Sequence, residues 1–340
     1  MNLWGGKRGA NVMKMPHYPV GRYKKNDDKE AFLERLNSVL GPQEELEYED
    51  LPEEYPTIHV IGAPRSGTTL LLQLIISNLN VGYISNLVAA FWSAPVYGIR
   101  LARFLLPERV ASSYQSDYGR TTEIHEPHEF GYFWREMLGY PDLAQKKDDH
   151  EHRIAWHRLR RVLINMTYAC DAPIAFKSFL LAWHIQKMQQ SLDKTCFLWI
   201  KRDPVENALS ILRCRQDYLG NVAKWSGLRP LEYASLQDEP VWRQAAGQVY
   251  YIEKAISEQA KKVSGRNILT ITYEDLCTDP VGVLRRTKEL VGRYYNRISL
   301  DNSPPTQFTL RKVSTENQDY YEEVKEAVEG FYGQPMPRSI

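Results

Sequence analysis

The sequence predicts an α/β fold in which helices flank a central parallel sheet of four to five strands. Two observations lead to this fold class. Short apolar segments of strand type alternate with longer segments of helical type, which is typical of parallel strands joined by right-handed crossovers. In addition, two of the helical segments begin with a clear start signal. The expected strands cover residues 57–61, 173–176, 195–200 and 268–272.

The start signal is the dipeptide Asp-Pro, found at residues 203–204 and 279–280. It combines a capping residue with a proline at the first helical position. Further helices are expected over residues 68–79 and around 183–192, each directly after an expected strand. Apolar residues spaced by three and four positions over 245–263 predict another helix with one face toward the core.

The composition is that of an ordinary globular protein, with 340 residues of which 43% are hydrophobic. Residues 1–55 are expected to form a polar lead-in with a short helix over 31–40, and residues 56–340 a single α/β domain. The net charge of +1 gives no reason to expect nucleic acid as a partner. The sequence carries no signature of a particular oligomeric state.

Cysteine content and hydropathy bear on the compartment. The four cysteines form no CxxC pair, which favours a reducing, cytoplasmic compartment. The first 25 residues lack the apolar run of a signal peptide. The most apolar long stretch, residues 81–106, is interrupted by Asn86, Arg100 and Arg103, so no transmembrane segment is expected.

The segment GAPRSGTT at residues 62–69 follows an expected strand and opens an expected helix. Backbone N–H groups at such a turn point toward a bound anion, and the helix dipole adds partial positive charge. An arginine can fork onto phosphate or sulfonate oxygens, hydroxyl groups add donors, and glycine lets the backbone approach the ligand. The candidate ligand-binding residues are Arg65, Ser66, Gly67, Thr68 and Thr69.

The glycine spacing also matches the nucleotide-triphosphate loop GxxxxGK[ST], but Thr68 stands at the lysine position. That lysine contacts the β- and γ-phosphates in NTPases, so its absence argues against them. A P-loop kinase acting on a small metabolite is therefore the second hypothesis. A nucleotide-binding module without turnover is the third.

A second anchor for an anion lies at Arg202 and Ser210. Arg202 ends an expected strand, and Ser210 lies two turns into the following helix, on the same face as Asn207. A ligand phosphate over this face could be held by Arg202 and Ser210 together.

The two anchors together resemble those of the sulfotransferase family, whose sulfo donor is 3′-phosphoadenosine 5′-phosphosulfate. The family's PxSGTT loop for the 5′-phosphosulfate is found here at residues 64–69, and its Arg-x7-Ser element for the 3′-phosphate matches Arg202 and Ser210. Two weaker matches are the sequence YEDL, which begins at Tyr273, and Lys177, which stands at the position of the family's catalytic lysine. Tyr273 is included among the candidate donor-binding residues. The resemblance covers residues 56–291 and implies a P-loop-like architecture.

The resemblance also implies a reaction, the in-line transfer of a sulfo group to an acceptor hydroxyl. No metal is required, because the donor is already activated. Lys177 would neutralise charge on the bridging oxygen, and Arg311 and Lys312 would close over the 3′-phosphate. The cytosolic branch of the family has the motif Lys-x-His at this position. In this chain Lys177 is followed two residues later by Phe179, so the histidine is missing. The resemblance therefore favours the bacterial, carbohydrate- and tyrosylprotein-like branch, several members of which use a glutamate base.

Residues 81–152 match no donor element and are expected to form an acceptor-binding insertion. The cluster EIHEPHEFGYFW at 123–134 places histidines and glutamates ahead of aromatic residues that could stack on a sugar. The candidate general base is Glu129 or Glu126, with His128 as the rival. The histidine spacing does not suit zinc, because HExxH places its histidines one helical turn apart. The favoured acceptor is a saccharide or glycolipid hydroxyl, with a small phenol or a peptide tyrosine still open.

We expect the bisphosphate product of the donor, adenosine 3′,5′-bisphosphate, to stabilise the fold far more than ATP with magnesium does. A ligand at a hundredfold excess over its Kd raises the free energy of unfolding by about 2.7 kcal/mol. Thermal melts with each nucleotide measure this difference. Equal shifts from the two nucleotides would contradict the donor assignment.

Overall fold

A five-stranded sheet lies at the centre of the computed structural model, which describes residues 19–106, 112–300, 303–313 and 319–333. The strand order is β2-β3-β1-β4-β5, and every pair of neighbouring strands is parallel. The predicted fold class is therefore confirmed. The strands are β1 (Thr57–Ile61), β2 (Gly82–Tyr83), β3 (Ile174–Lys177), β4 (Thr195–Lys201) and β5 (Ile268–Thr272).

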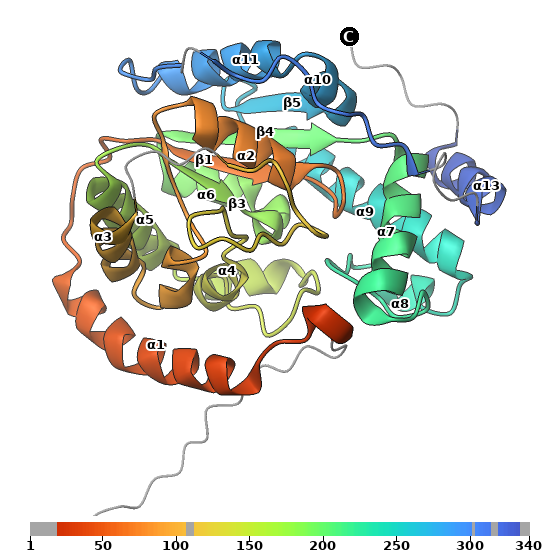
Figure 1. Ribbon diagram of the computed structural model, residues 1–340, viewed down its shortest axis with the longest axis horizontal. Helices are drawn as coiled ribbons and strands as arrows, with labels where there is room; N and C mark the ends of the chain where they lie inside the picture. The colour runs from red at the N-terminus through yellow and green to blue at the C-terminus, as the bar shows by residue number, and fades with distance from the viewer. Residues whose placement is uncertain (1–18, 107–111, 301–302, 314–318, 334–340) are drawn as a thin grey trace, which may run out of the picture.

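Helices cover both faces of this sheet (Figure 1). They are α1 (Asp27–Glu47), α2 (Thr68–Asn78), α3 (Pro95–Leu105), α4 (Gly131–Met137), α5 (Trp156–Cys170), α6 (Ile185–Ser191), α7 (Pro204–Leu219), α8 (Tyr233–Leu236), α9 (Val241–Ala260), α10 (Tyr273–Thr278), α11 (Pro280–Gly292) and α13 (Tyr321–Tyr332). Alternate residues of β4 point to opposite faces. Leu198 and Ile200 join the core beside α2 and α11, and Phe197 and Trp199 join the larger core on the other face.

Most element boundaries agree with the sequence prediction. β1 and β5 have the predicted limits, and α7 and α11 begin at Pro204 and Pro280. The helix expected around residues 183–192 is shorter, because a 3-10 turn at Phe179–Trp183 precedes α6. The sequence did not predict β2, whose two residues are too few to show a periodicity, or the helix α10 that starts at Tyr273.

The segment ahead of β1 contains more structure than the short helix expected over residues 31–40. Helix α1 has 21 residues and runs along the edge of the molecule opposite α11 (Figure 1). Asn37 and Glu44 on this helix are buried, at 3% and 1% exposure. Polar residues dominate α1, so the packed face is held by buried hydrogen bonds as well as by apolar contact. Neither α1 nor any other helix of the described residues has the length and apolar character needed to cross a membrane.

β1 lies at a topological switch point of the sheet. The chain leaves β1 through α2 for β2 and β3 on one side, and later forms β4 and β5 on the other side. At such a point the connections diverge to opposite faces and leave a crevice at the carboxyl ends of the strands. Ile61 pairs with Trp199, so the loop after β1 and the residues after β4 leave the sheet side by side.

We expect Glu44→Ala to lower the free energy of unfolding by about 1–3 kcal/mol, the usual cost of leaving buried donors unpaired. The Glu44 carboxylate accepts hydrogen bonds from the backbone N–H groups of Val96, at 3.0 Å, and Tyr97 at the first turn of α3. Urea denaturation measures the change. Gln43→Ala, on the exposed side of α1, is the control. Equal effects of the two substitutions would show that Glu44 does not hold α3.

Candidate active site

The loop between β1 and α2 ends at Gly67, the N-cap residue of α2. Gly67 has φ +107°, in the left-handed region that favours glycine, and no side chain caps this end of the helix. A Cβ at Gly67 would lie 2.6 Å from Cδ2 of Tyr273. The first N–H groups of α2 therefore lack a side-chain acceptor, and such a helix end is suited to bind an anion.

Ser66 indicates what kind of ligand this loop suits. Its side chain is fully buried, and its Oγ has no hydrogen-bond partner among the described residues. Buried polar atoms almost always have a partner in folded proteins. Ser66 does not line the cavity, whereas its neighbours Arg65, Gly67 and Thr68 do. The uncapped start of α2 and the unpartnered Oγ together are the features of the loop that fit the phosphosulfate that the sequence predicts.

Arg65 connects this loop to the second anchor. Its backbone has φ +70°, an uncommon conformation outside glycine that is often found at ligand sites. Its Nε donates a hydrogen bond to Oγ of Ser210 on α7 at 3.4 Å. The guanidinium also lies over the ring of Tyr118, 5.0 Å from the ring centroid. The two motifs found in the sequence thus meet in space.

Arg202 follows β4 and connects residues 62–69, named the donor loop after the expected donor, to the C-terminal part of the chain. Its Nη1 donates to the carbonyl of Arg65 at 3.3 Å, and its Nη2 donates to the carbonyl of Arg311 at 2.6 Å. The guanidinium lies 4.7 Å from the ring centroid of Tyr273. Burial lowers the pKa of Arg202, and nearby Tyr273 and Glu206 oppose this change. A buried cation of this kind favours an anionic ligand.

Lys177, the last residue of β3, lies between the donor loop and the 123–134 cluster. Its side chain is buried, and its Nζ donates to Oγ1 of Thr69 at 2.8 Å. Nζ also forms an ion pair with the carboxylate of Glu129, whose side chain is 40% exposed. The structure therefore brings together one residue from the donor loop, the lysine and one of the three base candidates.

Glu126, the second base candidate, lies in a different environment. It is 2% exposed, and its carboxylate accepts hydrogen bonds from the Ser113 backbone, the Ser112 hydroxyl and the Gln73 amide. Burial acts to raise the pKa of Glu126, but these hydrogen bonds outweigh it and hold the pKa below its usual value. The carboxylate thus fixes the chain around residue 113.

His128 lies on the wall of the same cavity as Glu129. Its Nδ1 accepts a hydrogen bond from the Phe130 backbone N–H at 2.9 Å. The ring of His128 can be reached from the cavity. Because protein surrounds the cavity on its other sides, burial lowers the pKa of His128 to about 4. The imidazole is therefore neutral at neutral pH, with one of its two nitrogens already engaged.

The aromatic residues after the cluster were expected to stack on a sugar, and for most of them this expectation is wrong. Phe130, Phe133 and Trp134 are at most 1% exposed and belong to the larger core. Helix α4 turns them inward because its apolar face must be buried against the sheet. Tyr132 lines the cavity instead, and its ring lies 4.7 Å from that of Trp92.

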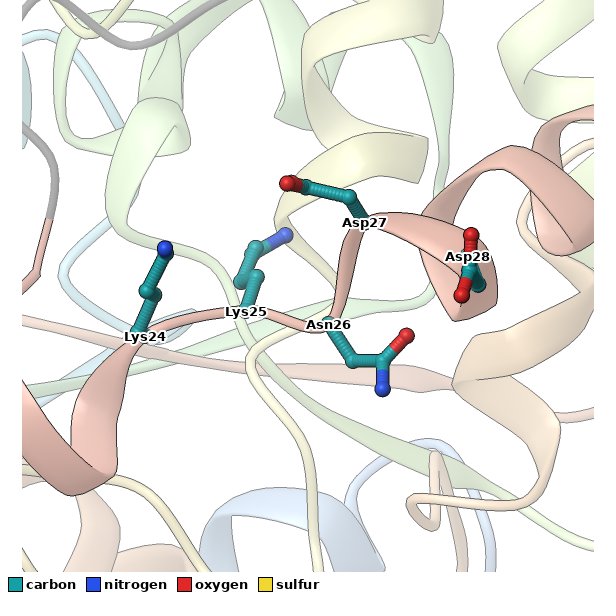
Figure 2. Close-up of a pocket in the computed structure, with 5 residues that line it drawn as sticks. All are labelled: Lys24, Lys25, Asn26, Asp27 and Asp28. Carbon is teal, nitrogen blue, oxygen red and sulfur yellow. The ribbon is translucent and has the colours of Figure 1, made fainter.

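The cavity that contains these residues has a volume of about 2130 Å³. Its wall includes Arg65, Thr68, Arg202, Ser210 and Arg311, but neither Ser66 nor Lys312. Residues 24–27, which lead into α1, also line it. A smaller hollow of about 500 Å³ lies there, and Figure 2 shows Lys24 and Lys25 extending to one side of the chain while Asn26 extends to the other.

Sequence reasoning missed several contributors to this site. Gly119 lies against Lys177 and Glu129: a Cβ there would lie 3.1 Å from Nζ of Lys177 and 3.1 Å from Oε1 of Glu129. Asn207 donates its amide to the carbonyl of Pro64 at 2.6 Å and so supports the donor loop. Gly119 carries no local motif. Asn207 lies on the same face of α7 as Ser210, which the sequence indicates, although the sequence assigned it no role.

The fold and the site together define an α/β protein with a loop suited to an anion at the switch point of a parallel sheet. The sequence profile of the sulfotransferase family matches residues 56–296, more than half of the chain. The protein therefore belongs to the sulfotransferase family, whose members take 3′-phosphoadenosine 5′-phosphosulfate as donor. No match to a curated protein was found.

Two solved structures share the fold. Sulfotransferase STF9 from Mycobacterium avium superposes with a TM-score of 0.55 at 16% sequence identity, over 90% of this chain and 82% of that one. Sulfotransferase STF1 from Mycobacterium tuberculosis H37Rv superposes with a TM-score of 0.50 at 14% identity, over 89% of this chain and 86% of that one. At such identities the likeness concerns the fold alone.

We expect Gly119→Ala to lower turnover at least about tenfold, since small displacements of catalytic groups are costly. The new Cβ would press on Lys177 and Glu129, and φ at this position is +86°. Gly333→Ala is the control, because Gly333 also has positive φ but has open space around it. Both variants should lose similar stability in thermal melts. If Gly119→Ala keeps full turnover, a side chain at residue 119 does not disturb the residues needed for transfer.

Proposed function

We propose that this sulfotransferase transfers the sulfo group to a hydroxyl of a saccharide or glycolipid. The transfer step of this proposal rests on one observation. Nζ of Lys177 donates a hydrogen bond to Thr69 in the donor loop and forms an ion pair with Glu129 on the cavity wall. A cation in this position can serve the leaving group on one side and the attacking hydroxyl on the other. Charge stabilisation of this kind supplies a large part of the catalysis in related transfers.

In this proposal the 5′-phosphosulfate binds at residues 65–69 and the 3′-phosphate binds Arg202 and Ser210. The hydrogen bond between Arg65 and Ser210 is long, at 3.4 Å, so phosphate oxygens can replace it at little cost. Arg311 is the C-terminal cation that we assign to the donor, because it lines the cavity and Lys312 does not.

The proposed step is an in-line displacement at sulfur. The oxygen of the acceptor hydroxyl forms a bond to sulfur while the bond from sulfur to the bridging oxygen breaks, and that electron pair leaves with the bisphosphate. Lys177 would stabilise the charge that grows on the bridging oxygen, and the hydroxyl proton would move to the Glu129 carboxylate. Lys177 and Arg65 supply the positive charge, so the step requires no metal.

Glu129 is the proposed base because its surroundings differ from those of its rivals. It faces the cavity next to Lys177, whereas the carboxylate of Glu126 is occupied by hydrogen bonds that make it a weaker base. One ring nitrogen of His128 is already engaged, because its Nδ1 accepts a hydrogen bond from the Phe130 backbone N–H, whereas Glu129 contacts Lys177 directly.

The cavity supports a large acceptor that combines polar and apolar parts. Its volume of about 2130 Å³ exceeds the roughly 300–1,000 Å³ of an ordinary small-molecule site. The wall also carries aromatic rings beside apolar side chains: Trp92, Tyr132, Tyr233, Leu33, Ala89 and Ala90. Aromatic faces suit sugar rings, and the aliphatic part suits the apolar chain of a glycolipid.

Two finer assignments belong to the same proposal. A glutamate base together with Phe179 in the place of the histidine supports the bacterial, carbohydrate- and tyrosylprotein-like branch of the family. All four cysteines are free thiols, which suits a cytoplasmic, reducing compartment.

The test is a transfer assay with radiolabelled donor against a panel of saccharides, glycolipids, phenols and tyrosine peptides. We expect label on a saccharide or glycolipid. Transfer to phenols or peptides alone would overturn the acceptor class. Donor binding with no transfer to any acceptor would favour the binding-module hypothesis.

Glutamine variants then test the base. Glu129→Gln should lower kcat by about 10²–10⁴-fold, the usual contribution of a positioned base, while the affinity for the bisphosphate changes little. Glu126→Gln should lower the melting temperature and keep most of kcat in the folded protein. If Glu129→Gln keeps full activity and His128→Ala abolishes it, the histidine is the base.

A further inference from the structure

A buried carboxylate lies directly behind the donor loop. Glu253, on α9, is 8% exposed and contacts two segments that the sequence separates widely. Its Oε1 accepts a hydrogen bond from the backbone N–H of Ala63 at 3.4 Å, and its Oε2 accepts one from the indole Nε1 of Trp199 at 3.1 Å. Neither partner carries a charge, so the hydrogen bonds leave the negative charge of the carboxylate uncompensated.

The charged and titratable groups that face Glu253 from the neighbouring elements of the described chain are Lys201 and Tyr332. Lys201, at the end of β4, lies over the ring of Trp199, with Nζ 4.8 Å from its centroid. The Tyr332 hydroxyl, on α13, is buried and has no hydrogen-bond partner among the described residues. Burial raises the pKa of Glu253 to about 7, and Lys201 opposes this only in part.

We propose that Glu253 is a positioning residue for the donor loop, and that the protein takes up a proton at Glu253 when the donor's 5′-phosphate binds there. The proposal rests on residues 65–69 holding that phosphate. Ala63 precedes Arg65 by two residues, and the hydrogen bond from its N–H sets where the loop begins. The ligand then brings negative charge to the other side of the same loop.

The direction of the effect follows from electrostatics. Two negative charges on opposite sides of one loop repel each other, because the protein between them screens less than water does. The bound phosphate therefore raises the pKa of Glu253 above its value in the free protein. By linkage, the ligand binds most tightly while Glu253 is protonated, below about pH 7, and loses affinity as the pH rises through the raised pKa.

A merely structural glutamate would not produce this pH dependence. Glu253→Gln keeps the shape and cannot titrate, but its amide oxygen can accept a hydrogen bond from only one of the two N–H donors, Ala63 or Trp199. The comparison therefore uses the change with pH: the affinity of the variant for adenosine 3′,5′-bisphosphate, relative to that of the wild type, should rise by roughly fivefold from pH 6 to pH 8. The titration of the ligand's own phosphates, with pKa near 6, affects both proteins equally and cancels in the comparison.

The experiment is isothermal titration calorimetry with adenosine 3′,5′-bisphosphate at pH 6, 7 and 8, in buffers of differing ionisation enthalpy. We expect wild-type protein to take up more protons on binding than Glu253→Gln. Glu258→Gln, the same substitution at an exposed position of α9, should behave as wild type. Equal proton uptake by wild type and Glu253→Gln would overturn the proposal. No binding by any of the proteins would overturn the donor site itself, and this inference with it.

A measurement on the wild-type protein covers the case in which Glu253→Gln does not fold. Adenosine 3′-phosphate lacks the charge that would face Glu253, so its binding should show little of the proton uptake seen with the bisphosphate. Equal uptake with the two nucleotides, after correction for their own phosphates, would also overturn the proposal.

Discussion

The parallel pairing of β1 with β4 is the constraint on which the site depends. Because Ile61 is paired with Trp199, the donor loop and Arg202 emerge together at one edge of the sheet. Arg202 then bonds to the carbonyl of Arg65, and Tyr273 after β5 packs against Gly67. The ends of three adjacent strands thus form one wall, and no single segment provides the binding surface by itself.

Positive charge is concentrated at this wall although the chain as a whole has a net charge of only +1. Lys177 and Arg202 are both largely buried, and burial of a cation costs free energy unless other groups compensate it. Carbonyl oxygens, the ring of Tyr273 and the carboxylates of Glu129 and Glu206 supply this compensation. In the proposed function a polyanionic donor would add to it, so the same charges that destabilise the free site would favour the bound state.

The positions of three glutamates matter as much for the site as those of the cations. Glu129 faces the cavity, Glu126 fixes a loop, and Glu253 supports the donor loop from behind. The residue type is the same in all three cases, and the environment decides the chemistry: a neighbouring cation, several hydrogen bonds, or burial with uncharged partners. This is why burial dominates at Glu253 and raises its pKa, whereas hydrogen bonds dominate at Glu126 and lower it.

The sequence by itself determined the fold class, and it located the loop at residues 62–69 and the junction that carries Arg202 and Ser210. These features are local: a strand, a turn and a helix start can be recognised within about ten residues, and their spacing carries the chemistry. Only the tertiary structure separated Glu129 from Glu126, turned Phe133 and Trp134 into the core, and placed Glu253 beside Ala63. Ala63 and Glu253 are 190 positions apart. Contacts across such a distance depend on how α9 packs on the sheet, which no local pattern of residues records.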